Sequence, residues 1–204
     1  MARRKTDTGA SLARERLLAT ASDLFYREGI HAVGVDRIIA EAGITRATFY
    51  RHFPSKEDLV EAYLGVEDAN IRGAFTAAGG MAGEPRELLH LVIEGLADDV
   101  SRHHTRGCPF INAAVEYPEE GSAVRERIAG HRAWFRGTLE SLLAAADAPD
   151  PVRAAGELVL LRDAAMVGGY LDGWERVRPA FIAAATRAAG LELVGADADR
   201  AVGT

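Results

Sequence analysis

The side chains best suited to chemistry in this sequence form a short row between Thr45 and Lys56. Hydroxyls, guanidinium groups, an aromatic ring and an imidazole recur at spacings that place them on the outer side of one short helix. Groups of this kind bond to phosphate oxygens and to base edges in a DNA groove. The row therefore predicts contacts with DNA. Its members, with one arginine on the preceding helix, are Arg37, Thr45, Arg46, Ala47, Thr48, Tyr50, Arg51, His52 and Lys56.

Seven of these nine side chains have an expected role at the DNA. Arg46 can bond guanine bidentately, and the methyl groups of Ala47 and Thr48 can contact thymine methyls. Phosphates are expected to be held by Thr45, Tyr50, His52 and Lys56. From spacing alone, the alternative is a helical hairpin whose polar face is only solvated.

A tight turn between two short helices must position the row. Apolar spacing predicts a helix over residues 12–28, a second over 35–42 and a third that Thr45 caps and that ends at His52. Gly29 is placed to end the first helix in the left-handed conformation, and the second helix is expected to stop at Gly43. The segment 34–53 then has the length of a helix-turn-helix that docks its second helix in a major groove. Arg3, Arg4 and Lys5 before it are expected either to follow the minor groove or to form a disordered tail.

The rest of the chain also shows helical spacing, and no set of strands is evident. Helices are expected over residues 56–75, 85–104, 109–117, 123–146, 151–174 and 178–189, with a glycine-rich linker at 78–83. The predicted fold is all-α, with a three-helix head and a body of roughly six helices. We expect a DNA-binding domain over 1–54, a ligand-binding and dimerisation domain over 55–193 and a flexible tail over 194–204.

Charge divides the chain in the same way. The net charge of the 204 residues is −6, but the first 56 hold ten Lys or Arg against six Asp or Glu. A cationic head on an acidic body suits a protein that meets a polyanion at one end. The single cysteine excludes an intramolecular disulfide, and no apolar run is long enough to span a membrane. We therefore expect a cytoplasmic protein with no membrane partner.

Enzyme chemistry has little support in the sequence. There is no phosphate-binding glycine loop, no nucleophile elbow and no histidine pair at metal spacing on one helix face. The prediction is a protein that is not an enzyme and uses no cofactor and no metal. A helical adaptor that binds no DNA is the other alternative.

The motifs of the head closely resemble the tetracycline-repressor (TetR) family of transcriptional regulators. The resemblance rests on Phe-Tyr-Arg-Glu-Gly at 25–29, on Ala-Gly-Ile-Thr-x-x-Thr-Phe-Tyr-x-His-Phe at 42–53 and on Ser-Lys-Glu-Asp-Leu at 55–59. It implies a homodimer that binds an inverted-repeat DNA operator and leaves it when a small-molecule effector binds. By the resemblance, Thr45 to Thr48 contact bases, and Tyr50, His52 and Lys56 hold the backbone. Gly34 departs from the family, which usually has Thr or Ser there.

The body contains aromatic and soft side chains that could line an effector site. Their chemistry favours a small, largely apolar effector held by a few polar groups. For any one of them, ordinary helical core is the alternative. The candidate ligand-binding residues are His103, Cys108, Phe110, Asn112, Tyr117, His131, Trp134, Phe135, Met166, Tyr170 and Trp174.

Cys108 has three interpretations. It precedes a predicted helix start at Pro109, and positive charge nearby could activate its thiol as an electrophile or redox sensor in the same DNA-binding framework. It could instead be a buried, inert cysteine. A metal site with His103 and His104 is the third interpretation, but adjacent histidines on a helix point apart.

The last two predicted helices carry small residues that permit close helix approach. By the resemblance, these helices pair with their twofold mates as the dimer interface. Packing within one chain is the alternative. The small residues are Ala154, Ala155, Ala164, Ala165, Gly168, Gly169, Ala183 and Ala184.

Overall fold

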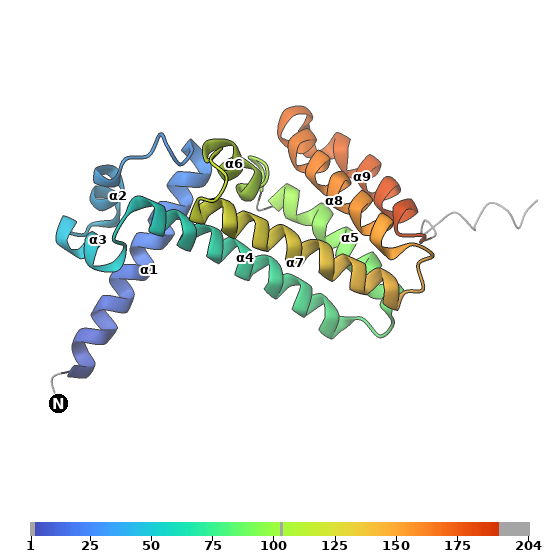
Figure 1. Cartoon of the computed structure of the whole chain (residues 1–204), viewed down its shortest axis with the longest axis horizontal. Coiled ribbons are helices and arrows are strands. Elements are labelled where there is room, and N and C mark those ends of the chain that lie inside the picture. Colours follow the sequence, from blue (N-terminus) through green and yellow to red (C-terminus); the bar gives the residue numbers. More distant parts are fainter. Residues whose placement is uncertain (1–2, 103, 192–204) are drawn as a thin grey trace, which may run out of the picture. The chain divides into compact units, whose positions relative to one another are not determined.

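The computed structural model describes residues 3–102 and 104–191, and over these ranges the chain is helical with no strands (Figure 1). The all-α prediction is confirmed. The helices in chain order are α1 Arg3–Glu28, α2 Val35–Ala42, α3 Arg46–His52, α4 Lys56–Met81, α5 Pro85–Arg102, α6 Pro109–Glu116, α7 Ala123–Ala145, α8 Pro151–Gly168, a π-helix Gly169–Gly173 and α9 Trp174–Ala188. None of these helices is long and apolar enough to cross a membrane.

Two compact units share the chain. The first contains the residues up to Ala69 together with Pro109–Gly130, and the second contains Asn70–Cys108 and the chain from His131 onwards. This division does not coincide with the predicted domain boundary after residue 54. The first half of α4 and the whole of α6 group with the DNA-binding head.

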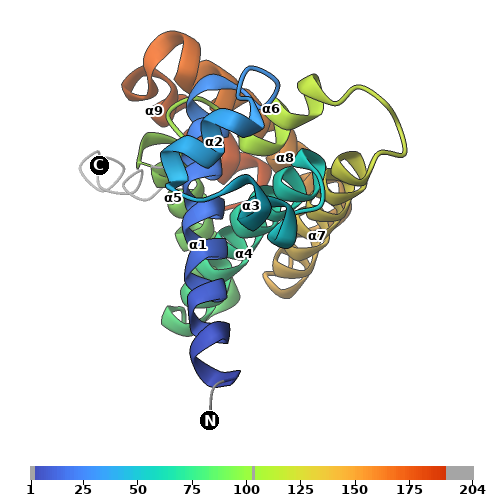
Figure 2. The ribbon, with the colours of Figure 1, turned by 90° about the vertical axis from the view of Figure 1, so that its left-hand side faces the viewer.

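In the first unit, α2 and α3 pack on α1 as a helix-turn-helix (Figure 2). Gly29 and Gly43 have φ angles of 97° and 63°, so both adopt the left-handed conformation that ends a helix. Ile38, Phe49 and Phe53 are buried and hold the two short helices together. A capping box starts α4, because the backbone N–H of Asp58 donates to Ser55 Oγ at 3.1 Å and that of Ser55 donates to Asp58 Oδ2 at 2.8 Å.

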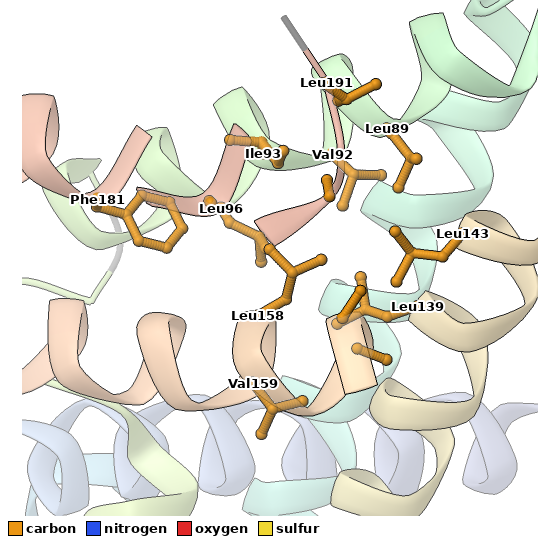
Figure 3. Packing of buried hydrophobic residues seen from close by; sticks show 14 of the residues in the cluster. Leu89, Val92, Ile93, Leu96, Leu139, Leu143, Leu158, Val159, Phe181 and Leu191 are labelled. Carbon is orange, nitrogen blue, oxygen red and sulfur yellow. The ribbon is translucent and has the colours of Figure 1, made fainter. Parts of the chain in front are cut away.

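The core of the second unit lies between α5, α7, α8 and α9 (Figure 3). Apolar side chains from each helix point into one interior, and several are fully buried. Burial of such side chains stabilises a helix far more than its intrinsic propensity does. The labelled members are Leu89, Val92, Ile93, Leu96, Leu139, Leu143, Leu158, Val159, Phe181 and Leu191.

Three predicted helix boundaries are wrong. The helix α1 begins at Arg3, nine residues before Leu12, so residues 3–5 are helical and not a coil. The segment 78–83 is mostly helical, since α4 continues through Gly79 and Gly80 to Met81, and the connection to α5 consists only of residues 82–84. The helix predicted to end at 174 stops earlier. Helix α8 ends at Gly168, and the π-helix that follows it ends at Gly173, whose φ is 89°. Helix α9 therefore begins at Trp174, before the expected turn.

Candidate functional site

The recognition helix α3 starts at a cap made by Thr45. Its Oγ1 accepts a hydrogen bond from the backbone N–H of Thr48 at 3.1 Å, and the two hydroxyl oxygens are 2.9 Å apart. The predicted cap is therefore confirmed. The pair also places two hydroxyls side by side at the amino-terminal end of the helix, where backbone N–H groups favour an anion.

Most of the predicted DNA-binding row is accessible to solvent. Tyr50 is 46% exposed while its neighbour Phe49 is fully buried, with the two ring centroids 5.1 Å apart in an edge-to-face pair. Ala47 and Arg51 are also exposed. Packing of Phe49 in the core thus holds Tyr50 on the outer face of α3.

Two arginines of the predicted interface are already ion-paired within the first unit. The Arg46 guanidinium pairs with Asp36, and both side chains are well exposed. Arg37 pairs with Glu28 at the end of α1 and, at 2.8 Å, with Glu41 on its own helix. The Glu28 pair raises the pKa of Arg37 further above its ordinary value. The sequence predicted the two arginines as interface residues but not their ion pairs with Asp36, Glu28 and Glu41.

His52 and Lys56 are less exposed than the rest of the row. His52 Nε2 is buried without a hydrogen-bond partner, and burial, with help from Arg51 and Arg14, lowers the pKa of its imidazole. Lys56 Nζ donates to the carbonyl of Ile30 at 2.6 Å, and burial lowers its pKa against the opposing charge of Glu116. Lys56 thus forms a hydrogen bond within the first unit, whereas His52 Nε2 forms none.

Glu116, at the end of α6, has a structural role that the sequence did not predict. Its carboxylate accepts hydrogen bonds from the backbone N–H groups of Ile30 at 2.8 Å and His31 at 2.5 Å. A side chain at Gly29 would place its Cβ 3.4 Å from Glu116 Oε1. The turn between α1 and α2 is thus fastened to α6. The contact joins positions more than eighty residues apart, so no local pattern indicates it.

The predicted effector residues fall in both units, and each set is described separately. In the first unit Phe110 is buried, Asn112 and Tyr117 are half-buried, and the Tyr117 ring lies 5.0 Å from that of His31. In the second unit, aromatic contacts bring together the rings of His131, Trp134 and Phe135, which lie 5.9 to 6.4 Å apart.

The other predicted effector residues of the second unit differ in burial. Met166 is fully buried, whereas Tyr170 is 55% exposed and lies in the π-helix. Trp174 packs on Gly169, and its Nε1 is buried with no hydrogen-bond partner. His103 lies outside the described residues.

Cys108 is buried, and its sulfur accepts a hydrogen bond from Arg162 Nη1 at 3.0 Å. Arg162 was not predicted as a site residue, because arginine in a helix is ordinarily exposed. Over the described ranges, no cluster of three or more His, Cys, Asp or Glu side chains could hold a metal ion. His104 contacts a carboxylate instead, with its Nδ1 2.7 Å from Asp99 Oδ2.

Two family models match the chain. Residues 17–63 match the bacterial regulatory proteins of the tetR family, and residues 85–178 match the tetracyclin repressor-like C-terminal domain. The first match contains the whole helix-turn-helix. The second contains α5 to α8 and the turn into α9.

Known proteins resemble the chain over most of its length or over about half of it. The crystal structure of SCO4454, a TetR-family transcriptional regulator from Streptomyces coelicolor, is 43% identical with a TM-score of 0.85 and covers 88% of this chain and 95% of its own. The transcriptional repressor BepR of Brucella suis is 26% identical over 84% of both chains. The transcriptional activator FasR of Mycolicibacterium smegmatis is 31% identical over 55% of this chain, which spans about half (52%) of FasR. This chain belongs to the TetR family of DNA-binding transcriptional regulators.

Proposed function

We propose that the protein is a ligand-responsive repressor whose homodimer binds an inverted-repeat operator and leaves it when a small effector binds. The observation that carries the proposal is the exposed row on α3, with Tyr50 held outward by buried Phe49 and two hydroxyls at the helix start. Repression is favoured over activation by BepR, a repressor that matches most of the chain, whereas the match to the activator FasR covers about half of it.

A dimer supplies what one recognition helix cannot. The seven residues of α3 offer too little contact area for specific binding, and two heads about 34 Å apart can occupy successive major grooves. An exposed apolar stripe on α8 supports such a dimer, because large apolar side chains separated by eight, seven and four residues lie near one face of the helix and are 47 to 70% exposed. The stripe, which we call the α8 stripe, consists of Val152, Leu160, Val167 and Leu171, the last in the π-helix.

The small residues expected at the interface contribute less to this surface. Ala154, Ala155 and Ala165 are buried within their own chain. Gly169 is closely approached by Trp174 and Val100 of the same unit. The proposed dimer face therefore consists mainly of large exposed side chains of α8. Of the predicted small residues on this helix, Ala164 is exposed and can also contribute to the face.

Effector control needs only a preference of the ligand for one conformation. A preference of about 1.4 kcal/mol shifts the equilibrium between heads that fit the operator and heads that do not by tenfold. In the proposed mechanism the effector binds in the second unit and favours the conformation that does not fit.

Selection of binding sites from a randomised double-stranded DNA pool tests the proposal. We expect an inverted repeat that binds less tightly as salt rises, because bound phosphates release counterions. Tyr50→Ala should weaken binding to the selected DNA, whereas Val115→Ala, a change at an exposed position of α6, should not. Recovery of no salt-sensitive DNA sequence would refute the proposed function.

A further inference from the structure

Arg162 on α8 is a buried cation with an unused hydrogen-bond donor. The residue is 5% exposed, and its Nε is buried and makes no hydrogen bond. Its Nη1 donates to Cys108 Sγ at 3.0 Å and, at 3.4 Å, to Asp163 Oδ1. A thiol sulfur is a weak acceptor. A buried guanidinium is therefore held by one weak acceptor and one long contact to a carboxylate, which is poor compensation for the loss of water.

The carboxylates near Arg162 have closer partners of their own. Asp163 Oδ2 accepts from Arg132 Nη2 at 2.8 Å, and Asp99 Oδ2 lies 2.7 Å from His104 Nδ1. Burial works to lower the pKa of Arg162, but Cys108, Asp163 and Asp99 together raise it, so the side chain stays charged. Arg162 thus shares the Asp163 carboxylate with Arg132, which makes the shorter contact to it.

The surroundings of Arg162 are apolar along one face of α8. The ring of Phe135, itself 6% exposed, lies 5.7 Å from the guanidinium carbon. Met166 follows four residues along the helix and Gly169 seven, so both lie on the same face as Arg162. At Gly169 this face meets the indole of Trp174, whose Nε1 is a second buried donor without a partner. Both unused polar atoms are N–H donors, so the face favours a ligand that brings acceptors.

We propose that the effector is a small organic acid whose carboxylate binds Arg162 and whose apolar body extends along this face of α8 toward Trp174. The inference rests on the proposed ligand-responsive function and assigns the chemical class of its ligand. A carboxylate suits the site because its two oxygens match the planar fork of a guanidinium, including the unused Nε–H. The acid would take the place of the Cys108 sulfur as the main acceptor, and Phe135 and Met166 would contact the apolar body.

Matched acids and amides test the chemical class. The probes are benzoate, phenylacetate and octanoate against benzamide, phenylacetamide and octanamide, with binding to the full-length protein followed by calorimetry and by fluorescence of Trp174 and Trp134. We expect at least one acid to bind about tenfold or more tightly than its amide, since the amide lacks the charge that pairs with Arg162. The same acid should release the selected DNA.

Variants of Arg162 test the site. Arg162→Met, which keeps much of the volume, should abolish the preference for the acid, and Arg162→Lys should reduce it by removing the fork. Arg153→Met, on the same helix but exposed, should leave acid binding unchanged. Should Arg162→Met fail to fold by circular dichroism, protection of wild-type Cys108 from iodoacetamide by the acid, and not by its amide, provides the second measurement.

Equal binding of acids and amides, or no binding of any acid in the panel, would overturn the inference. An acid preference that survives in a folded Arg162→Lys variant at full strength would also overturn the role of the guanidinium fork. These outcomes are independent of the proposed function. A protein that binds acids through Arg162 but selects no DNA would refute the repressor and leave the acid site standing.

Discussion

Glu116 Oε1 accepts a hydrogen bond of 2.8 Å from the backbone N–H of Ile30, which joins the end of α6 to the turn that leads from α1 into α2. The second oxygen of the same carboxylate binds the next N–H along the chain, that of His31. These donors stand just after the left-handed Gly29, where the chain has left helix α1. A single side chain thus satisfies two consecutive backbone groups at the base of the helix-turn-helix.

Glu116→Ala should destabilise the head by about 1–3 kcal/mol, because two backbone N–H groups, of which that of Ile30 is partly buried, lose a charged acceptor. Glu116→Gln should cost less, since its amide oxygen can still accept. Urea unfolding followed by circular dichroism measures the change. The control is Glu119→Ala, at an exposed position in the loop after α6, which should have no measurable effect. Equal stability of the Glu116→Ala and wild-type proteins would show that the contact does not stabilise the fold.

Thr45→Ala should cost about 1 kcal/mol of stability in the absence of DNA, because the N–H of Thr48 loses its cap. Thr45→Asp should restore the cap and the stability but weaken DNA binding, since it adds a negative charge that faces the phosphates. Comparing the free energy of unfolding with the DNA dissociation constant of the two variants separates the roles. A Thr45→Asp protein that binds DNA as well as wild type would contradict the assignment of Thr45 to the interface.

Asp36 forms an ion pair with the guanidinium of Arg46 in the protein without DNA. Asp36→Asn should therefore raise DNA affinity several-fold, by freeing Arg46 and by removing a negative charge near the phosphates. Arg46→Ala should weaken binding and relax the preference for one base. Glu126→Gln, at an exposed site on α7, controls for the change in net charge. If Asp36→Asn and Glu126→Gln have the same effect on affinity, the Arg46–Asp36 pair does not limit DNA binding.

His52 makes the stability of the head depend on pH. Its pKa in the folded protein lies below the ordinary histidine value, so the unfolded chain takes up the proton first as the pH falls. Stability contributed by neutral His52 is therefore full well above the ordinary histidine pKa. It is lost as the pH falls through that value, until the folded form titrates as well.

The measurement compares wild type with His52→Gln from about pH 7.5 to about pH 5.5, where histidine titrates. Wild type should lose more stability than the variant over this range. The other histidines are the same in both proteins, so their contributions cancel in the comparison. Identical losses would show that burial of the His52 imidazole has no energetic consequence.

Local features of the site could be predicted from the sequence, and distant ones could not. Gly43 and Thr45 act on residues within a few positions of themselves, so their types and spacing predict the turn and the cap. Glu116 and Arg162 act on partners 86 and 54 residues away, and nothing in the neighbouring sequence specifies those contacts. Composition also misled the prediction at 78–83, where Gly79 and Gly80, with no proline beside them, remain helical in α4 and only Gly83 lies outside it.

The α8 stripe should hold the proposed homodimer together. Leu160, which is 69% exposed on α8, lies near the middle of the stripe, so Leu160→Glu would place one charge from each subunit close together at the twofold axis. Burying an unpaired charge costs several kcal/mol, which is enough to dissociate a dimer at micromolar concentration. Sedimentation should show a monomer for Leu160→Glu and a dimer for wild type. Val115→Glu, also at an exposed apolar position but in the first unit, should remain a dimer. The Leu160→Glu monomer should bind the selected inverted repeat much more weakly although its recognition helix is intact, because one head contacts only one half-site. A monomeric variant that keeps full affinity for the repeat would refute binding by two heads.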